Sequence, residues 1–175
     1  MVCSRARFHQ FLLALVGVVV FWSVASYAAG KFPAALEGAI LAKALKYDDS
    51  LPAKPKILIL AAGGNASDAK VMAKAFASLG GSVEIASPGE VSERIRGANA
   101  LYAFPGLLND SARALCVSHK VISLSGDPSD ALSAKASIAI GVEGGKPQII
   151  VHLSRSKAES HKLSSRLLKL AKVVQ

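Results

Sequence analysis

Short apolar runs alternate with amphipathic stretches through the middle of the chain. The runs KILILA, SVEIA, ALYAF and KVISLS have the length and the composition of buried strands. The stretches 67–79, 87–97 and 110–119 repeat apolar residues at helical spacing, and an earlier stretch from Pro33 to about Tyr47 does the same. Strands that alternate with helices predict a mostly parallel sheet that is covered on both faces.

Several of these helices carry recognisable start signals. Ser67 is expected to be the N-cap of the helix 67–79, which Gly80-Gly81 should end. Ser87 and Glu90 have the spacing of a capping box, and Pro88 occupies the first helical position. Asp127-Pro128 is expected to start one further short helix.

The pattern changes near the C-terminus. The runs ASIAIGVE and KPQIIVHL are joined by Gly144-Gly145, which predicts a two-residue hairpin turn. A final helix is then expected, with Ser156 and Glu159 as its capping box. Its apolar face would contain Leu163, Leu167, Leu170 and Val174. The fold class that follows is a single-domain three-layer α/β sandwich, with a mostly parallel sheet, a C-terminal antiparallel hairpin and a final packed helix.

The basic residues of that final helix form a separate face. Lys162, Arg166 and Lys169 lie next to the apolar stripe rather than within it. A solvated outer face explains them most simply, and docking of an acidic partner is the alternative.

The first 28 residues have the layout of a secretory signal peptide. Arg5 and Arg7 precede an apolar run at 11–24, and small residues follow up to Ala28. The run is shorter than the roughly 20 residues that span a bilayer, although an uncleaved anchor is the alternative. We therefore expect a cleaved leader over residues 1–28, export to the periplasm, and one domain over residues 29–175.

Charge and cysteine content exclude some functions. The formal net charge is +9, but the cations are scattered singly without interleaved aromatic residues, which disfavours nucleic-acid binding. Cys116 is the one cysteine of the exported part, so no internal disulfide can form. Its apolar helical context, ARALCV, predicts a buried and inert thiol.

The stretch KILILAAGGNASDAK begins as nucleotide-binding loops do. It lacks the Gly-Lys-Ser/Thr of a P-loop and the third glycine of a dinucleotide loop. Glu84 stands near the position of a ribose-binding acid, but any strand–helix–strand unit places some residue there. The stretch therefore predicts a strand, a turn served by Gly63-Gly64 and a helix, with no cofactor.

A binding crevice remains expected at the carboxyl edge of the sheet, where loops after parallel strands meet. These loops are small and rich in Gly and Pro, and several precede helix N-termini that can hold an anion. Ordinary caps and turns are the competing explanation. The candidate contacts to a ligand or partner are Gly63, Gly64, Asn65, Ser67, Pro105, Gly106 and Asp127.

Metal and catalytic motifs are absent from the sequence. His119, His152 and His161 are widely spaced, and no paired cysteine accompanies them. There is no G-x-S-x-G, and helix capping explains Asp127 better than acid–base chemistry does. These observations predict neither a metal site nor an enzyme, and favour a binding or regulatory role.

Two segments carry a resemblance to a known family. ALEGAILAKALKYDDSLP, at 35–52, and IIVHLSRSKAESHKLSSRLLKLAKVV, at 149–174, are similar to the start and the end of YfiR-like periplasmic proteins. The run Leu163-Ser164-Ser165-Arg166-Leu167-Leu168 is its most specific part. In it we expect the serines to bond free N–H groups at a helix start while the leucines pack, with a partner contact as the alternative.

The resemblance implies a non-enzymatic regulator. The best-known kind in this family represses an inner-membrane diguanylate cyclase and so lowers cyclic di-GMP and biofilm formation, and some relatives accompany sensor kinases or outer-membrane receptors. Homodimers are associated with the family, whereas the disulfides of some relatives cannot form from Cys116 alone. The alternative is a periplasmic sensory or transport-associated protein that binds a small anion.

Overall fold

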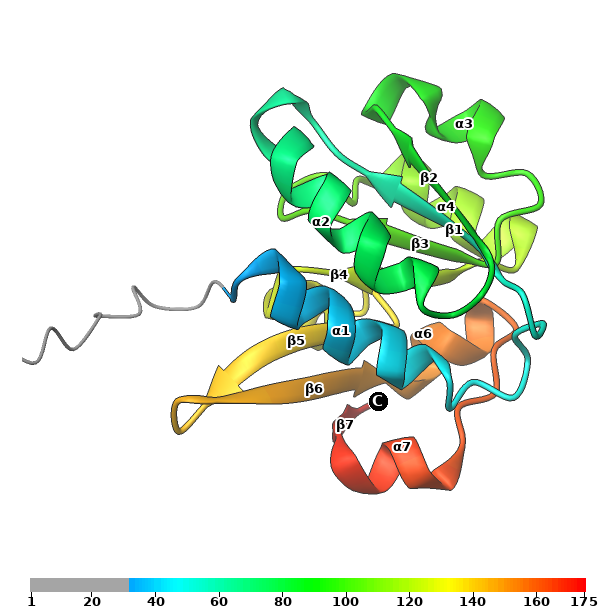
Figure 1. The fold of residues 1–175 in the computed structure, drawn as a ribbon. Coiled ribbons are helices and arrows are strands. Elements are labelled where there is room, and N and C mark those ends of the chain that lie inside the picture. Colours follow the sequence, from blue (N-terminus) through cyan, green and yellow to red (C-terminus); the bar gives the residue numbers. More distant parts are fainter. Residues whose placement is uncertain (1–31) are drawn as a thin grey trace, which may run out of the picture.

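The computed structural model describes residues 32–175, which form a seven-stranded sheet with helices on both faces (Figure 1). The strand order is β2-β1-β3-β4-β5-β6-β7. The predicted three-layer α/β sandwich is confirmed. Its helices and strands are α1 (Ala34–Leu45), β1 (Lys56–Leu60), the 3₁₀ turn η1 (Gly63–Asn65), α2 (Ala66–Ala77), β2 (Ser82–Ala86), the 3₁₀ turn η2 (Pro88–Glu90), α3 (Val91–Arg94), β3 (Ala100–Ala103), α4 (Asp110–His119), β4 (Ile122–Ser125), α5 (Pro128–Leu132), β5 (Ile138–Glu143), β6 (Lys146–His152), α6 (Leu153–Ala158), α7 (Ser165–Leu170) and β7 (Lys172–Val174).

The first five strands pair in parallel, and β5 and β6 form the predicted antiparallel hairpin. Gly144 and Gly145 have φ values of 56° and 76°, which the two-residue turn requires and which glycine adopts without strain. The strand β7 pairs in parallel with β6 and was not predicted. It makes the last residues of the chain an edge of the sheet.

Two apolar layers hold the helices to the sheet. On one face α1, α2 and α7 pack on side chains such as Ile57, Tyr102 and Val151. On the other face α3 and α4 pack on Leu58 and Leu101, and Cys116 of α4 is fully buried there, as predicted. The central strands are buried on both faces, which explains why they read as continuous apolar runs.

The predicted single C-terminal helix is wrong. The chain forms α6, a linker over 159–164, α7 and then β7. Glu159 does not cap a helix start, because its carboxylate is fully buried and bonded to Ser123 and Ser137. Ser160 has φ 64° directly after it, so the backbone turns away from the helical path.

The serine run begins α7, but not by the predicted bonds. Ser164 is the N-cap of α7, yet its side chain makes no capping hydrogen bond, and its Oγ has no hydrogen-bond partner among the described residues. Its backbone instead donates to Tyr47 O at 2.8 Å. The leucine part of the prediction holds for Leu163 and Leu167, which are buried, whereas Leu170 is 65% exposed.

The predicted signal peptide over residues 1–28 lies outside the described residues. Among residues 32–175, no helix has both the length and the apolar character needed to cross a bilayer.

The contact between α1 and α2 depends on Gly38. A Cβ there would lie 2.8 Å from Ala75 Cβ and 3.0 Å from Met72 Sδ, and Ala75 has no flexible end that could move aside. We predict that Gly38→Val lowers the free energy of unfolding by about 1–3 kcal/mol through overpacking, as measured by urea denaturation. Ala39→Val, at an exposed position of the same helix, is the matched control. Equal effects of the two substitutions would contradict the prediction.

Candidate functional site

The carboxyl edge of the sheet brings the predicted loops together. Because β1, β3 and β4 are parallel neighbours, the loops that follow them leave from the same edge. These loops contain Gly63 to Asn65, Pro105-Gly106 and Asp127, and α2 begins there with Ala66 and Ser67. All seven predicted contact residues therefore share one edge of the sheet, as the topology requires.

Most helix N-termini at this edge are closed by the chain itself. The predicted capping box of Ser87 and Glu90 is present, and the Ser87 amide donates to Glu90 Oε2 at 2.9 Å. Asn109 Oδ1 accepts from the Ala112 amide at 2.9 Å, and Asp127 Oδ1 accepts from the Ser129 amide at 2.8 Å. Asp127 is thus a cap, as expected, and these termini have fewer free donors for a ligand.

The start of α2 differs from the prediction. Ser67 is not the N-cap, because the 3₁₀ turn η1 leads straight into a helix that begins at Ala66. Asn65 occupies the N-cap position without a side-chain capping bond. The preceding turn accepts amides at this N-terminus instead, because Asn65 N donates to Ala62 O at 2.9 Å and Ala66 N donates to Gly63 O.

The glycines before α2 are not required by the turn. Neither Gly63 nor Gly64 has a positive φ, and a Cβ at either position would meet nothing within 4 Å. Both residues lie in the turn η1, as expected, but the turn does not require glycine at either position. Their effect is to leave the loop backbone bare, which allows a ligand or a partner to approach it closely.

A buried carboxyl–phenol pair lies beneath the same edge. Tyr102 of β3 donates its hydroxyl hydrogen to Glu37 Oε1 of α1 at 2.7 Å, and both side chains are buried. Burial raises the pKa of Tyr102 strongly, and the Glu37 charge raises it further, so the phenol stays protonated and remains a donor. A Cβ at Gly126 would lie 2.7 Å from the Tyr102 hydroxyl and 2.8 Å from Glu37 Oε1, so only glycine fits above the pair.

This pair was not found from the sequence. Its partners are 65 residues apart, and neither Glu37 in a helix nor Tyr102 in an apolar strand belongs to a motif. Asp68, in the first turn of α2, also raises the pKa of Tyr102 through its charge. The carboxyl edge is therefore acidic beneath its glycine-rich loops, which reduces its attraction for anions.

A second cluster, at the opposite end of α1, joins the two ends of the described chain; we call it the junction. Asp48 follows α1, and His161 lies in the linker between α6 and α7. His161 Nδ1 is 2.6 Å from Asp48 Oδ2, and both side chains are buried. Backbone bonds extend the contact, because the Asp49 amide donates to Lys162 O at 3.0 Å and the Lys162 amide donates to Ser50 Oγ at 2.9 Å.

The geometry of the junction favours a charged His161. Nε2 lies 3.0 Å from Lys120 O, and Nδ1 faces a carboxylate, so both ring nitrogens have acceptors and both donate. Burial by itself lowers the pKa of His161, but the hydrogen bond and charge of Asp48, with smaller contributions from Lys120 O and Glu159, leave it raised. The imidazolium and the Asp48 carboxylate therefore form a buried ion pair.

A third buried cluster fixes α6 to the sheet. Glu159 accepts hydrogen bonds from the Ser123 amide at 2.9 Å, from the Ser123 hydroxyl at 2.6 Å and from the Ser137 hydroxyl. Arg155 Nε donates to Glu159 Oε1 at 2.8 Å, and its Nη2 donates to Arg113 O at 2.7 Å. The buried charge of Glu159 is thus paired and hydrogen-bonded, which is the arrangement of a structural ion pair.

The other residues considered for chemistry are accounted for by local contacts. His152 caps α6 by accepting from the Arg155 amide at 3.2 Å, and burial raises the pKa of the Cys116 thiol above its ordinary value. Glu84 pairs with Lys56 at 3.1 Å, and this contact accounts for its position without a bound ribose. Over residues 32–175, no three His, Cys, Asp or Glu side chains are grouped so that they could hold a metal ion.

The cavities described lie away from the predicted contact residues. A groove of about 450 Å³ runs between α1 and α2, lined by Ala39, Ala42, Lys43, Lys46, Tyr47, Ala75 and Ser78. Two smaller ones, of about 300 and 250 Å³, lie beside the 51–55 loop and between α5 and the β5–β6 hairpin. None of the three is lined by the seven predicted residues.

Comparison with known proteins finds a similar fold but no family. No protein-family model matches the chain, and no curated protein matches it significantly. A crystal structure of a conserved domain protein from Vibrio cholerae O1 biovar El Tor str. N16961 is similar, with a TM-score of 0.60 at 12% sequence identity. The match covers 82% of this chain and 60% of that chain, so this chain spans about three fifths of the length of its structural relative.

The junction predicts a pH-dependent contribution to stability. The folded pKa of His161 is raised above the unfolded value of about 6.5, so the contribution is complete below that pH and is lost as pH rises through the folded pKa. We predict that His161→Gln lowers the free energy of unfolding by about 3 kcal/mol in mild acid, and by less at alkaline pH. Urea titrations across this range measure the difference.

The exposed His119 offers the matched control for this prediction. His119→Gln should change the stability little, and by the same amount at every pH. A His161→Gln effect that is constant with pH, or that grows as the pH rises, would show that the buried imidazolium does not stabilise the fold.

Proposed function

We propose that this chain is a periplasmic, non-enzymatic regulatory protein of the YfiR-like kind. In this role it binds and represses an inner-membrane signalling protein, such as a diguanylate cyclase or a sensor kinase. Repression of a cyclase lowers intracellular cyclic di-GMP and biofilm formation.

One observation carries this proposal. The two segments that resemble the family, 35–52 and 149–174, lie at opposite ends of the domain sequence, yet they meet at the junction through Asp48 and His161. The residues that the resemblance singles out therefore form one structural unit. This supports the resemblance in that both segments belong to the same part of the fold.

A binding role also fits the character of the described residues. Their buried ionisable groups are engaged in structural pairs, and the exposed ones are spread over a rigid sheet and its helices. A protein of this kind acts by presenting a surface, and its effect on a partner is the difference in affinity for the partner's two states.

The proposal predicts a change in a second messenger. Deletion of the gene in the native host should raise intracellular cyclic di-GMP, measured by mass spectrometry, and a copy of the full chain should restore the original level. A copy that lacks residues 1–28 is the matched control, and it should fail because it stays in the cytoplasm. Unchanged cyclic di-GMP and biofilm after deletion, across several growth conditions, would refute the cyclase form of the proposal.

A small-anion binder is the second candidate function. The specific observations in its favour are the bare glycine backbone at Gly63-Gly64 and the N-terminus of α2, which lacks a side-chain cap. Against it stands the acidic character of the edge, where Asp68 in the first turn of α2 competes with an anion for the same positive end of the helix.

A ligand screen separates the two candidates. If the second is correct, a phosphate or carboxylate metabolite at 100 times its Kd should stabilise the protein by about 2.7 kcal/mol in a thermal-shift assay. Gly64→Val should abolish the shift by covering the backbone. Gly89→Val is the control, because a Cβ there also meets nothing within 4 Å, but it lies before a helix that is already capped. A flat screen, or a shift that survives Gly64→Val, would exclude this site.

A further inference from the structure

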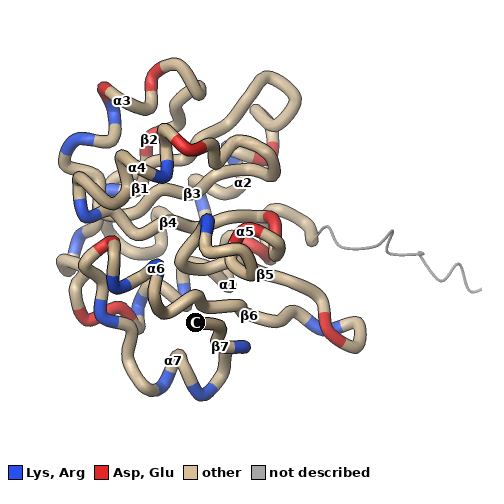
Figure 2. The backbone as a smooth tube through the Cα atoms, turned by 180° about the vertical axis from the view of Figure 1, so that it is seen from behind, with Lys and Arg blue, Asp and Glu red and all other residues tan. Residues whose placement is uncertain are grey.

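The C-terminal corner of the molecule is basic and partly apolar. We define this corner as the exposed side chains of α7 and β7, namely Arg166, Lys169, Leu170, Lys172 and Val173. Residues 160–175 contain no Asp or Glu. Figure 2 shows the cations of α7 and β7 without an acidic residue on either element.

The three cations of the corner are not used by the fold. Arg166, Lys169 and Lys172 are exposed, and none of them forms an ion pair within residues 32–175. Other arginines do have partners, since Arg155 pairs with Glu159 and Arg94 with Glu90. The three cations of the corner are thus exposed to solvent and left without an ionic partner among the described residues.

An exposed leucine lies among these cations. Leu170 is 65% exposed, the largest fraction among the exposed large apolar residues of the described chain, and Val173 beside it is 38% exposed. Leu163 and Leu167 of the same segment are buried, so these two residues are the ones that face the core. Leu170 is therefore left outside the core by the structure, and water is a poor environment for it.

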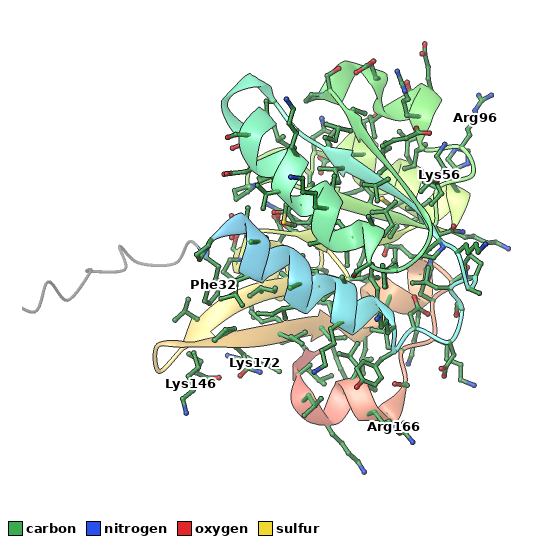
Figure 3. All side chains as sticks on the ribbon, viewed as in Figure 1. Phe32, Lys56, Arg96, Lys146, Arg166 and Lys172 are labelled. Atoms are coloured by element: carbon green, nitrogen blue, oxygen red, sulfur yellow. The ribbon has the colours of Figure 1, made fainter. Side chains whose placement is uncertain are left out.

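The corner projects from one end of the molecule. In Figure 3, Arg166 points away from the body of the fold below α7, while Lys172 and Lys146 lie beneath the β5–β6 hairpin. A convex end of this kind can touch a flat surface without moving the rest of the domain. Lys172 also borders the groove between α5 and the hairpin, but Arg166, Lys169 and Leu170 line none of the three described cavities.

We propose that this C-terminal corner binds the surface of an anionic phospholipid bilayer, with Arg166, Lys169 and Lys172 at the headgroups and Leu170 inserted between them. The inference goes beyond the proposed function and does not depend on which protein is regulated. It would hold the domain at the membrane in which a signalling partner resides.

The chemistry of the corner favours a lipid surface over an acidic protein. Lysine is depleted at protein–protein interfaces, whose energy comes from a desolvated apolar centre with anchors in pockets. The corner offers one well-exposed leucine, without a groove around it, and cations on long flexible side chains. Interfacial lipid binding uses this combination, because anionic headgroups attract lysine and arginine without requiring a fixed register.

Vesicle sedimentation tests the proposal with the purified chain 29–175. The protein should pellet with phosphatidylcholine vesicles that contain phosphatidylglycerol and not with phosphatidylcholine alone, and high salt should release it. The triple variant Arg166→Glu/Lys169→Glu/Lys172→Glu should weaken this binding by at least about tenfold. Leu170→Ser should weaken it severalfold and leave the salt dependence in place.

The matched control reverses three exposed lysines elsewhere, as Lys54→Glu/Lys70→Glu/Lys74→Glu. It has the same net charge as the triple corner variant and should retain binding. Urea denaturation of both variants should match the wild type, because all six side chains are exposed.

Three results would overturn the proposal. The first is a wild-type protein that ignores the anionic vesicles. The second is equal loss of binding in the two triple variants, which would assign it to net charge. The third is a corner variant that binds vesicles normally but fails to restore cyclic di-GMP in the deletion strain, because the corner would then contact a protein. Failure of the function proposal is recognised separately, by unchanged cyclic di-GMP after deletion.

Discussion

The buried ion pair between Asp48 and His161 is the contact on which the arrangement of the C-terminal part depends. The linker 159–164 alternates between buried and exposed residues, and it brings an ionisable ring, that of His161, into the interior. Such a path is stable only if its polar groups find partners. Asp48, Ser50 and Lys120 O supply the partners, and α7 can then place Leu163 and Leu167 on the core. Without the pair, the same leucines would be attached to a segment with an unpaired buried charge.

Glu159 completes this constraint from the other side of the linker. Its carboxylate crosses to Ser123 and Ser137, at the amino ends of two central strands, and Arg155 neutralises it. Glu159 thus attaches the chain to the sheet. His161, two residues later, attaches it to Asp48, which follows α1. This explains why the C-terminal segment is divided into α6 and α7, although its leucines have the spacing of one continuous helix.

Most of the fold was predictable because its elements follow local rules. Apolar runs marked β1 to β4, the Gly144-Gly145 turn marked the hairpin, and Ser87 with Glu90 marked a helix start. The prediction of one final helix fails because the Glu of a Ser-x-x-Glu sequence can bond either a local amide at a helix start or distant groups of the fold. Glu159 can bond a local amide, but the buried Ser123 of β4 and Ser137 just before β5 offer it more donors. A local pattern cannot reveal that competition, since the serines lie 22 and 36 residues earlier in the chain.

The candidate site likewise has one part that the sequence predicts and another that long-range contacts determine. The topology alone places Gly63, Pro105 and Asp127 at one edge, because parallel neighbours end together. The pair of Glu37 and Tyr102 beneath that edge depends on how a helix packs across the sheet. No residue spacing in the sequence predicts that contact. The prediction of Ser67 as the N-cap fails because a 3₁₀ turn places the N-cap at Asn65.

These contacts assign different tasks to the two ends of α1. At its amino end, Glu37 and Tyr102 lie beneath loops in which Gly126 is required by close packing, whereas Gly63 and Gly64 have open space around them. At its carboxyl end, Asp48 holds the segment that presents the basic corner. The same helix thus contributes to the support of both the loop edge and the segment that carries the corner. α1 therefore connects the two regions, and its close contact with α2 at Gly38 fixes its position on the sheet.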